Sequence, residues 1–362
     1  MAGRNGTRRV VIVVGAVLAI AAAVTVTAVA ATGAAHAPTV PFAYVANSGD
    51  GTITPVNLTT GRAGAPIKAG RDPAAIAVTP DGATAYVASG CGCSIVTPVN
   101  LATDRAGTPI KAGTGLSAIA ITPDGKTAYV VAPFQHAVIP VDLTTGRPGA
   151  PIRLGAAPSG FAIPYGLNPD SIAITPDGKT AYVVDGSYLG ALYPVNLATR
   201  RPGTPITFGS STPVAIAIAP GGKTAYVVAL AVQLDVDPSF AAATVIPVNL
   251  ATGRAGTPIK AGTGLSAIAI APDGRTAYVV QPFNGMVVRV NLATGKLETP
   301  IETGTDLEAI AINPSGKTAY VVDDGAFIGN GDGTIIPVNL ATGHPGTPIK
   351  VGLRPDAIAI TR

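Results

Sequence analysis

The chain is poor in the residues that carry most catalytic chemistry. Among 362 residues there are two cysteines and three histidines, His36, His136 and His344. A serine-histidine-aspartate triad on the folded part would have to use His136, and no Gly-x-Ser-x-Gly elbow is present. The cysteines form a Cys91-Gly92-Cys93 pair. A bridge across one residue is strained, so a strained disulfide and two free thiols both remain open, while a zinc site would lack nearby histidine.

Charge is also scarce. Only 12% of the residues are charged, with 24 Lys and Arg against 20 Asp and Glu. The basic residues are scattered about one to a turn, without an aromatic stacking platform, and there is no nucleotide-binding loop. We therefore expect no nucleic-acid partner. Glycine and proline are abundant, at 44 and 33 residues, as a sheet protein rich in turns requires.

A unit of about 42 residues repeats from residue 42 to the end of the chain. It contains four strand-length segments, separated by Pro-Asp-Gly turns, Ala-Thr-Gly turns and variable loops. Four strands in a repeat of this length are typical of a β-propeller blade. The marker is the tyrosine of an Ala-Tyr-Val run, which recurs at Tyr44, Tyr86, Tyr129, Tyr182, Tyr226, Tyr278 and Tyr320.

Seven copies of each segment predict an all-β fold, a seven-bladed β-propeller of four-stranded antiparallel blades. We name the strands of a blade inner (Ala-Ile-Ala-Ile), second (Ala-Tyr-Val), third (Val-Asn-Leu) and outer (Pro-Ile). The chain enters at a second strand, with Phe42, and leaves at an inner strand, from Asp356 to Thr361. One blade is therefore expected to be composite, with its inner strand from the C-terminus and the other three from the N-terminus. This closes the ring and pairs two exposed edges.

The third strand raises a local conflict. Six of its seven copies carry a proline, for example Pro55, and one carries Arg289 instead. Proline cannot donate to a ladder, so we expect a bulge or an unpaired position there.

The runs at 119–131 (Ile-Ala-Ile-Thr-Pro-Asp-Gly-Lys-Thr-Ala-Tyr-Val-Val) and 247–253 (Pro-Val-Asn-Leu-Ala-Thr-Gly) carry a family resemblance. The chain resembles the YVTN-type β-propeller repeat family (YncE-like) over residues 42–362. The resemblance implies the fold and a bacterial surface or secreted protein, with a seven-bladed lactonase group as a more distant relative. The Trp-bearing blade motifs of quinoprotein propellers are missing, because the chain has no tryptophan.

Residues 1–37 stand apart from the repeats, and 38–362 are expected to form the propeller. Arg4, Arg8 and Arg9 precede an almost wholly apolar stretch at 10–31, long enough to span a bilayer. We expect an export segment. A cleaved signal and a retained single-pass anchor both remain open, so the propeller is expected outside the cytoplasm, secreted or anchored to the outer face of the membrane.

A meander of four strands gives the disc two unlike faces. The Pro-Asp-Gly and Ala-Thr-Gly turns lie on one, the turn face. The second-to-third loops and the loops to the next inner strand lie on the other, the loop face, which holds almost all the variation. Function on a repeat scaffold is expected where the insertions are. Aromatic residues that bind a ligand there, or pin its long loops, are Phe134, Phe161, Tyr165, Tyr188, Phe240, Phe283 and Phe327.

Three acids, Asp170, Glu308 and Asp356, occupy one repeat position, just before the inner strand at the channel mouth. Asp72 and Asp306 lie close by in the corresponding loops. The three carboxylates of Asp170, Glu308 and Asp356 could hold a hard cation such as calcium, serve as an acid/base set, or form a solvated rim of charge. A second calcium-like stretch, 330–334, is matched by 48–52 in another blade, so a repeated turn explains both.

The sequence favours a non-catalytic extracytoplasmic propeller, expected to be monomeric, that binds a protein or glycan through its loop face and needs no cofactor unless calcium. The alternatives are a hydrolase or lactonase-like enzyme using the channel-mouth carboxylates and a structural protein of the cell surface.

Overall fold

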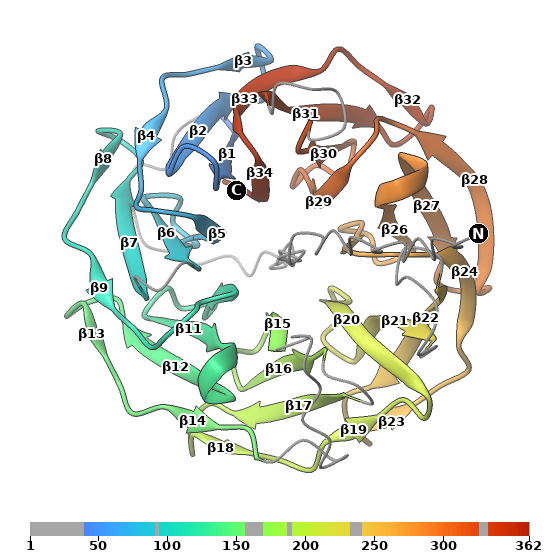
Figure 1. The fold of residues 1–362 in the computed structure, drawn as a ribbon. Coiled ribbons are helices and arrows are strands. Elements are labelled where there is room, and N and C mark those ends of the chain that lie inside the picture. Colours follow the sequence, from blue (N-terminus) through green and yellow to red (C-terminus); the bar gives the residue numbers. More distant parts are fainter. Residues whose placement is uncertain are drawn as a thin grey trace, which may run out of the picture.

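The structure, a computed structural model, describes residues 40–90, 94–155, 169–186, 190–231, 241–325 and 332–361. Within them seven antiparallel sheets stand in a ring around a central axis, which confirms the seven-bladed propeller (Figure 1). The end of this axis at the loop face is the channel mouth predicted from the sequence. The predicted export segment lies outside the described residues. In the part that is described, no helix is long and apolar enough to cross a membrane.

We number the blades from the composite one. The inner strands, from blade 1 to blade 7, are β34 (Pro355–Ile360), β5 (Pro73–Val78), β10 (Ala118–Ile121), β15 (Pro169–Ile174), β20 (Ser211–Ile218), β25 (Ile268–Ile270) and β29 (Leu307–Ile312). The second strands are β1 (Phe42–Asn47), β6 (Thr84–Ser89), β11 (Thr127–Ala132), β16 (Thr180–Asp185), β21 (Thr224–Ala231), β26 (Thr276–Gln281) and β30 (Thr318–Asp323). The third strands are β2 (Thr52–Asn57), β7 (Ile95–Asn100), β12 (Ala137–Asp142), β17 (Ala191–Asn196), β22 (Ala242–Asn249), β27 (Met286–Asn291) and β31 (Asp332–Asn339).

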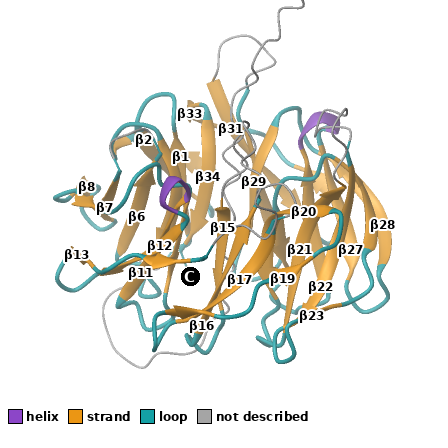
Figure 2. Cartoon of the chain, turned by 60° about the horizontal axis from the view of Figure 1, so that its bottom comes forward, coloured by secondary structure: helices purple, strands orange, loops and turns teal. Residues whose placement is uncertain are grey.

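The outer strand is split in six blades. Its pieces are β3 (Arg62–Ala63) and β4 (Ile67–Lys68), β8 (Arg105–Ala106) and β9 (Ile110–Lys111), β13 (Arg147–Pro148) and β14 (Ile152–Arg153), β18 (Arg201–Pro202) and β19 (Ile206–Thr207), β23 (Arg254–Ala255) and β24 (Ile259–Thr263), and β32 (His344–Pro345) and β33 (Ile349–Leu353). Blade 6 has one unbroken outer strand, β28 (Lys296–Glu302). The short 3-10 helices η1 (Pro133–Gln135) and η3 (Pro282–Asn284) are the purple turns of Figure 2.

The proline of the third strand explains the split. In blade 1 the carbonyl of Pro55 accepts a 2.7 Å hydrogen bond from Gly64 N, so the polar groups of Pro55 face the outer strand. The missing donor therefore falls on that side, and the ladder breaks there, as the sequence predicted. In blade 6 Arg289 restores the donor, pairs with Glu298 across the sheet and forms a 2.7 Å ion pair with it.

The composite blade is confirmed. Strand β34 pairs antiparallel with β1, with Tyr44 opposite Ala359 and Val45 opposite Ile358. The closure ends in two 2.8 Å hydrogen bonds, from Phe42 N to Thr361 Oγ1 and from Thr361 N to Phe42 O. In Figure 1 the C-terminal end lies beside β1. Because this closure uses only residues 42–361, the ring is complete without residues 1–37.

The hydrophobic core consists of seven clusters, one between each pair of neighbouring blades. Side chains alternate along an inner strand, so its alanines face one neighbour and its isoleucines face the other. Between blades 3 and 4, for instance, Ala118 and Ala120 meet Ile172 and Ile174. The same pairing of an alanine face with an isoleucine face recurs at every blade junction. Large residues thereby fill the space that small ones leave.

This complementarity predicts non-additive mutational costs. Ala120→Leu should destabilise the propeller by about 1–3 kcal/mol, because Ala120 is fully buried and an added side chain overpacks the junction. Ile172→Ala should cost about 2–5 kcal/mol through a cavity. The double variant should lose clearly less than the sum, as measured by denaturant unfolding in a double-mutant cycle. If the losses of unfolding free energy in the two single variants simply added in the double variant, the proposed packing of small against large side chains would be contradicted.

Candidate functional site

The inner strands of five blades begin with a β-bulge at the same repeat position. The register shifts by one residue at each, which leaves one extra residue on the inner strand: Ala74, Asp170, Val214, Glu308 and Asp356. A bulge re-aims the side chain it carries and is common beside functional sites. The three acids predicted at the channel mouth are thus bulge residues.

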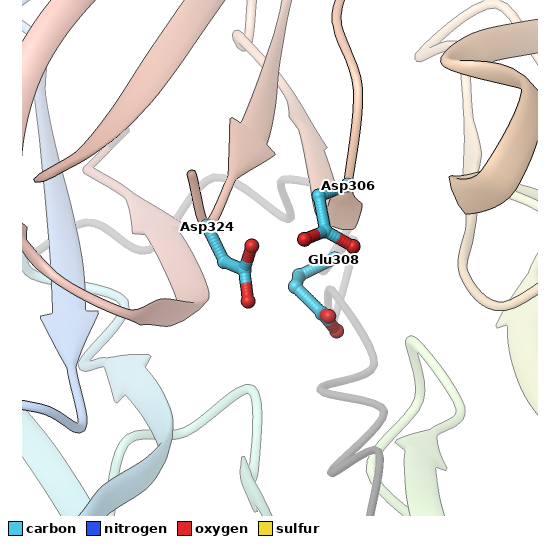
Figure 3. A group of neighbouring side chains, drawn as sticks. All are labelled: Asp306, Glu308 and Asp324. Atoms are coloured by element: carbon cyan, nitrogen blue, oxygen red, sulfur yellow. The ribbon is translucent and has the colours of Figure 1, made fainter. Parts of the chain in front are cut away.

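The structure describes the side chains of two of these three acids, Glu308 and Asp356. The side chain of Asp170 lies outside the described residues. Glu308 and Asp356 are in neighbouring blades, 7 and 1, whose inner strands β29 and β34 pack side by side. Glu308 gathers instead with Asp306 and Asp324 of its own blade. One carboxylate oxygen of each lies within 4.8 Å of the others. Figure 3 shows the three side chains next to one another.

Backbone geometry brings Asp306 and Asp324 together. Asp306 has a positive φ of 51°, and its carbonyl accepts a 3.1 Å hydrogen bond from Asp324 N. A left-handed backbone is sterically costly for most residues, and aspartate tolerates it better than most. The same bond joins Asp72 O to Gly90 N in blade 2 and Arg354 O to Ser48 N in blade 1. Asp324 was missed as a site residue in the sequence, and aligning it with Ser48 and Gly90, directly after the second strand, could have found it.

Asp323 holds the two loops of this cluster. Its carboxylate accepts hydrogen bonds from Thr305 N at 3.3 Å and from Gly325 N at 3.0 Å, next to Asp306 and Asp324 respectively. Burial raises its pKa, and the two backbone donors oppose that shift. In blade 1 Asn47 has the same place, where its Oδ1 accepts a 3.1 Å hydrogen bond from Gly352 N. In blades 7 and 1 the last residue of the second strand is thus a polar side chain whose hydrogen bonds position the channel-mouth loops.

Glu308 is the most perturbed acid that the structure describes. The residue is 7% exposed, and its carboxyl has no ion pair within the described residues. Burial raises the pKa of Glu308 to about 9, with further contributions from Asp324, Asp356 and Asp306, while Arg354 acts in the opposite direction. Without a bound cation, Glu308 is therefore protonated at neutral pH.

Asp356 extends the acidic arc into blade 1. Burial raises its pKa to about 6, and the Ser48 hydroxyl and the charge of Arg354 oppose that shift. The Ser48 hydroxyl itself donates a 3.1 Å hydrogen bond to the Arg354 carbonyl. Asp72 of blade 2 and Asp324 of blade 7 raise the pKa of Asp356 further. The arrangement offers two kinds of chemistry: carboxylate oxygens for a cation, or two carboxyls of different pKa for proton transfer.

Two of the seven predicted aromatics lie within the described residues, Phe134 on η1 and Phe283 on η3. Phe161, Tyr165, Tyr188, Phe240 and Phe327 lie outside them, as do Cys91 and Cys93. Phe134 is 73% exposed and Phe283 54% exposed. Each helix starts with proline, and each is followed by a residue of left-handed backbone, His136 or Gly285. The two helices belong to blades 3 and 6 and lie on opposite sides of the channel (Figure 1, green beside β12 and orange beside β27).

Comparisons with known proteins define the fold and go no further. No family model matches the chain, and no curated protein sequence matches it, so membership of the YVTN-type family stays a prediction. Solved structures do match. Hydrazine synthase of Kuenenia stuttgartiensis superposes with a TM-score of 0.71 at 20% identity, over 86% of this chain and 99% of the other. A putative 6-phosphogluconolactonase from Bacteroides uniformis gives 0.69 at 19% identity, over 89% and 99%.

A third match, a protein of unknown function from Desulfotomaculum acetoxidans, gives a TM-score of 0.67 at 16% identity, over 89% of this chain and 99% of the other. At such identities the likeness shows a shared propeller fold. The chain is a seven-bladed propeller similar to hydrazine synthase and lactonase-like propellers, and its chemistry must be argued from its own residues.

The perturbed carboxyl predicts a pH dependence of stability. The unfolded chain releases the Glu308 proton near its ordinary pKa of 4.5, whereas the native state holds it to about 9. Between these values the native state binds more protons, so stability falls as pH rises. Glu308→Gln should remove this slope and stabilise the protein by on the order of a few kcal/mol near pH 9, with little difference at pH 4.

Thermal melts of parent and Glu308→Gln across pH 4–9, with a chelator present, test this. Asp72→Asn is the matched control, because it removes a carboxyl of the same arc from blade 2, which is separated from blade 7 by blade 1, and should leave the slope nearly unchanged. A parent and Glu308→Gln variant with parallel pH profiles would show that Glu308 is not buried as an acid.

Proposed function

We propose that this protein is a non-catalytic, extracytoplasmic binding propeller that takes a protein or glycan partner on its loop face. The observation that carries the proposal is the pair of exposed phenylalanines on that face. Among the described residues, the large exposed hydrophobic side chains are Phe134, Phe283, Leu297 and Leu353, and the two aromatic ones occupy equivalent loops of blades 3 and 6.

The Phe134 ring packs directly on a neighbouring segment of the chain. A Cβ atom added to Gly115 would lie 2.2 Å from the Phe134 ring, so the ring rests directly on that glycine. A ring that is exposed yet fixed loses little conformational entropy on binding, which favours it as an anchor for a partner. The positions flank a channel mouth with acids at Asp72, Asp306, Glu308, Asp324 and Asp356. Apolar anchors around a polar centre suit an amphipathic partner.

The location outside the cytoplasm is supported by the basic start and the apolar stretch at 10–31. Charges on the loop face are mostly negative around the channel, with Arg71 and Arg354 as the nearby bases. Such a field disfavours anionic polymers as partners.

A hydrolase or lactonase-like enzyme is the second candidate, and one observation favours it. Burial and neighbouring charge raise the pKa of Glu308 to about 9 and that of Asp356 to about 6, so one carboxyl can serve as an acid while the other serves as a base. A similar structure carries the name of a putative lactonase, and at 19% identity that likeness concerns the fold. Lactone and glycoside hydrolysis assays decide this alternative.

Capture of a partner from cell-envelope extract on the immobilised propeller, residues 38–362, tests binding. Phe134→Ala with Phe283→Ala should abolish recovery of the partner and shift the unfolding free energy by no more than about 0.5 kcal/mol each, as exposed positions do. Leu297→Ala is the matched control, because Leu297 is similarly exposed, at 46%, but lies on the outer strand of blade 6. Undiminished capture by the phenylalanine variant would refute the loop-face anchor.

A further inference from the structure

We propose that Asp306, Glu308 and Asp324 bind a calcium ion at the channel mouth. The inference deepens the proposed function and rests on it in placing ligand recognition on the loop face. The first observation is the mutual distance. One oxygen from each of the three carboxylates lies within 4.8 Å of the others. Ca–O distances are about 2.3–2.6 Å, so ligands on opposite sides of one ion lie roughly 5 Å apart and a single ion can contact all three.

The second observation is the state of Glu308. Glu308 is 7% exposed. The ion pairs found among the described residues are Lys179–Asp177 and Arg289–Glu298, so the Glu308 carboxyl has no ion pair there, and the charge of Arg354 favours its ionised form only in part. In Figure 3 this carboxyl lies below that of Asp306 and to the right of that of Asp324, and one oxygen of each is within 4.8 Å of the others. A buried carboxyl without an ion pair is costly, and the fold does not need one there, since the same bulge holds Ala74 and Val214 in other blades. A cation supplied from solution would satisfy it.

The repeats provide an internal comparison. The positions of Asp306, Glu308 and Asp324 correspond to Arg354, Asp356 and Ser48 in blade 1. In blade 1 the corresponding positions are a hydroxyl, Ser48, and a base, Arg354, and both lower the pKa of Asp356. The charge of Arg354 also acts on Glu308, but blade 7 has no base or hydroxyl of its own at these positions. In blade 7 both of those positions are carboxylates. Blade 7 therefore has three acids where blade 1 has one acid, one base and one hydroxyl.

Blade 2 completes the comparison, with Asp72, Ala74 and Gly90 at the same three positions. It keeps one carboxylate and no buried acid. Of these three neighbouring blades, blade 7 alone has a full set of ligands on a shared backbone geometry.

The donor set selects the ion. All three ligands are carboxylate oxygens, which suit hard cations, and the cluster includes no histidine or cysteine that would favour zinc. Calcium accepts irregular geometry and six to eight oxygens, so water completes its shell on the open side. Magnesium requires a near-ideal octahedron and gives up water reluctantly. We therefore expect three carboxylates from two loops and a bulge to bind magnesium more weakly than calcium.

Isothermal titration of the propeller, residues 38–362, with calcium chloride tests the site directly. We expect one calcium per chain, weaker binding of magnesium, and a rise in melting temperature with calcium concentration. Glu308→Gln and Asp324→Asn should each weaken calcium binding by roughly tenfold or more. Asp72→Asn, at the Asp306 position of blade 2, should bind calcium as the parent does.

No heat of binding and no thermal shift at millimolar calcium would overturn the site, as would Glu308→Gln that binds like the parent. Equal weakening by Asp72→Asn would also overturn it, since a diffuse acidic surface would then explain the binding. A melt in chelator shows that each variant is folded. The titration contains no partner, so its failure leaves the loop-face anchor standing. If instead the proposed phenylalanine anchor is wrong, the variant with both phenylalanines replaced will capture the partner as the parent does, and calcium binding will be intact.

Discussion

The packing of an alanine face against an isoleucine face, repeated at all seven blade junctions, is the constraint on which the rest of the structure depends. Inner strands converge on the channel, so their side chains have little room, and two rows of isoleucine would not fit between neighbours. Two rows of alanine would leave voids. The strict alternation gives each inner strand one face of large side chains and one face of small ones. The alanine face of each blade therefore always packs against the isoleucine face of the next blade. Ring closure follows, because Ile358 of the last strand meets Ala309 and Ala311 as any other blade would.

The same regularity explains how much could be predicted from the sequence. The blade number, the composite blade and the break opposite Pro55 all follow from local rules: strand period, turn residues and the missing proline donor. The site follows from local rules only in part. Glu308 and Asp356 were predicted at the channel mouth from their repeat position, but that position could not reveal that each is the extra residue of a β-bulge. The closeness of Asp324 to Asp306 depends on a backbone hydrogen bond between segments 18 residues apart, which no local pattern records.

Departures from the repeat are therefore more informative than the repeat itself. A scaffold of seven near-identical units satisfies its backbone and core in every blade, so a position that differs in one blade is not required by the fold. Arg289 shows the structural form of such a departure: it replaces a proline, restores the outer strand and pairs with Glu298. Glu308 shows the other form. Its bulge position holds Ala74 or Val214 in two blades and an aspartate in two others. Burial disfavours the charged form of Glu308, and Glu308 gains no ion pair within the described residues in return.

A buried acid of this kind lowers the stability of the fold and, at the same side chain, favours the binding of a ligand. The cost of burial is tolerable because it falls on one junction of seven, and each of the others retains its own packed cluster. The Asp323 carboxylate, tied to Thr305 N and Gly325 N, keeps the flanking loops in place whether or not Glu308 is charged. The fold thus supplies a rigid frame around a carboxylate that is unfavourable by itself. Any ligand that neutralises this carboxylate recovers the free energy that its burial costs, which is the physical basis for selective binding at the channel mouth.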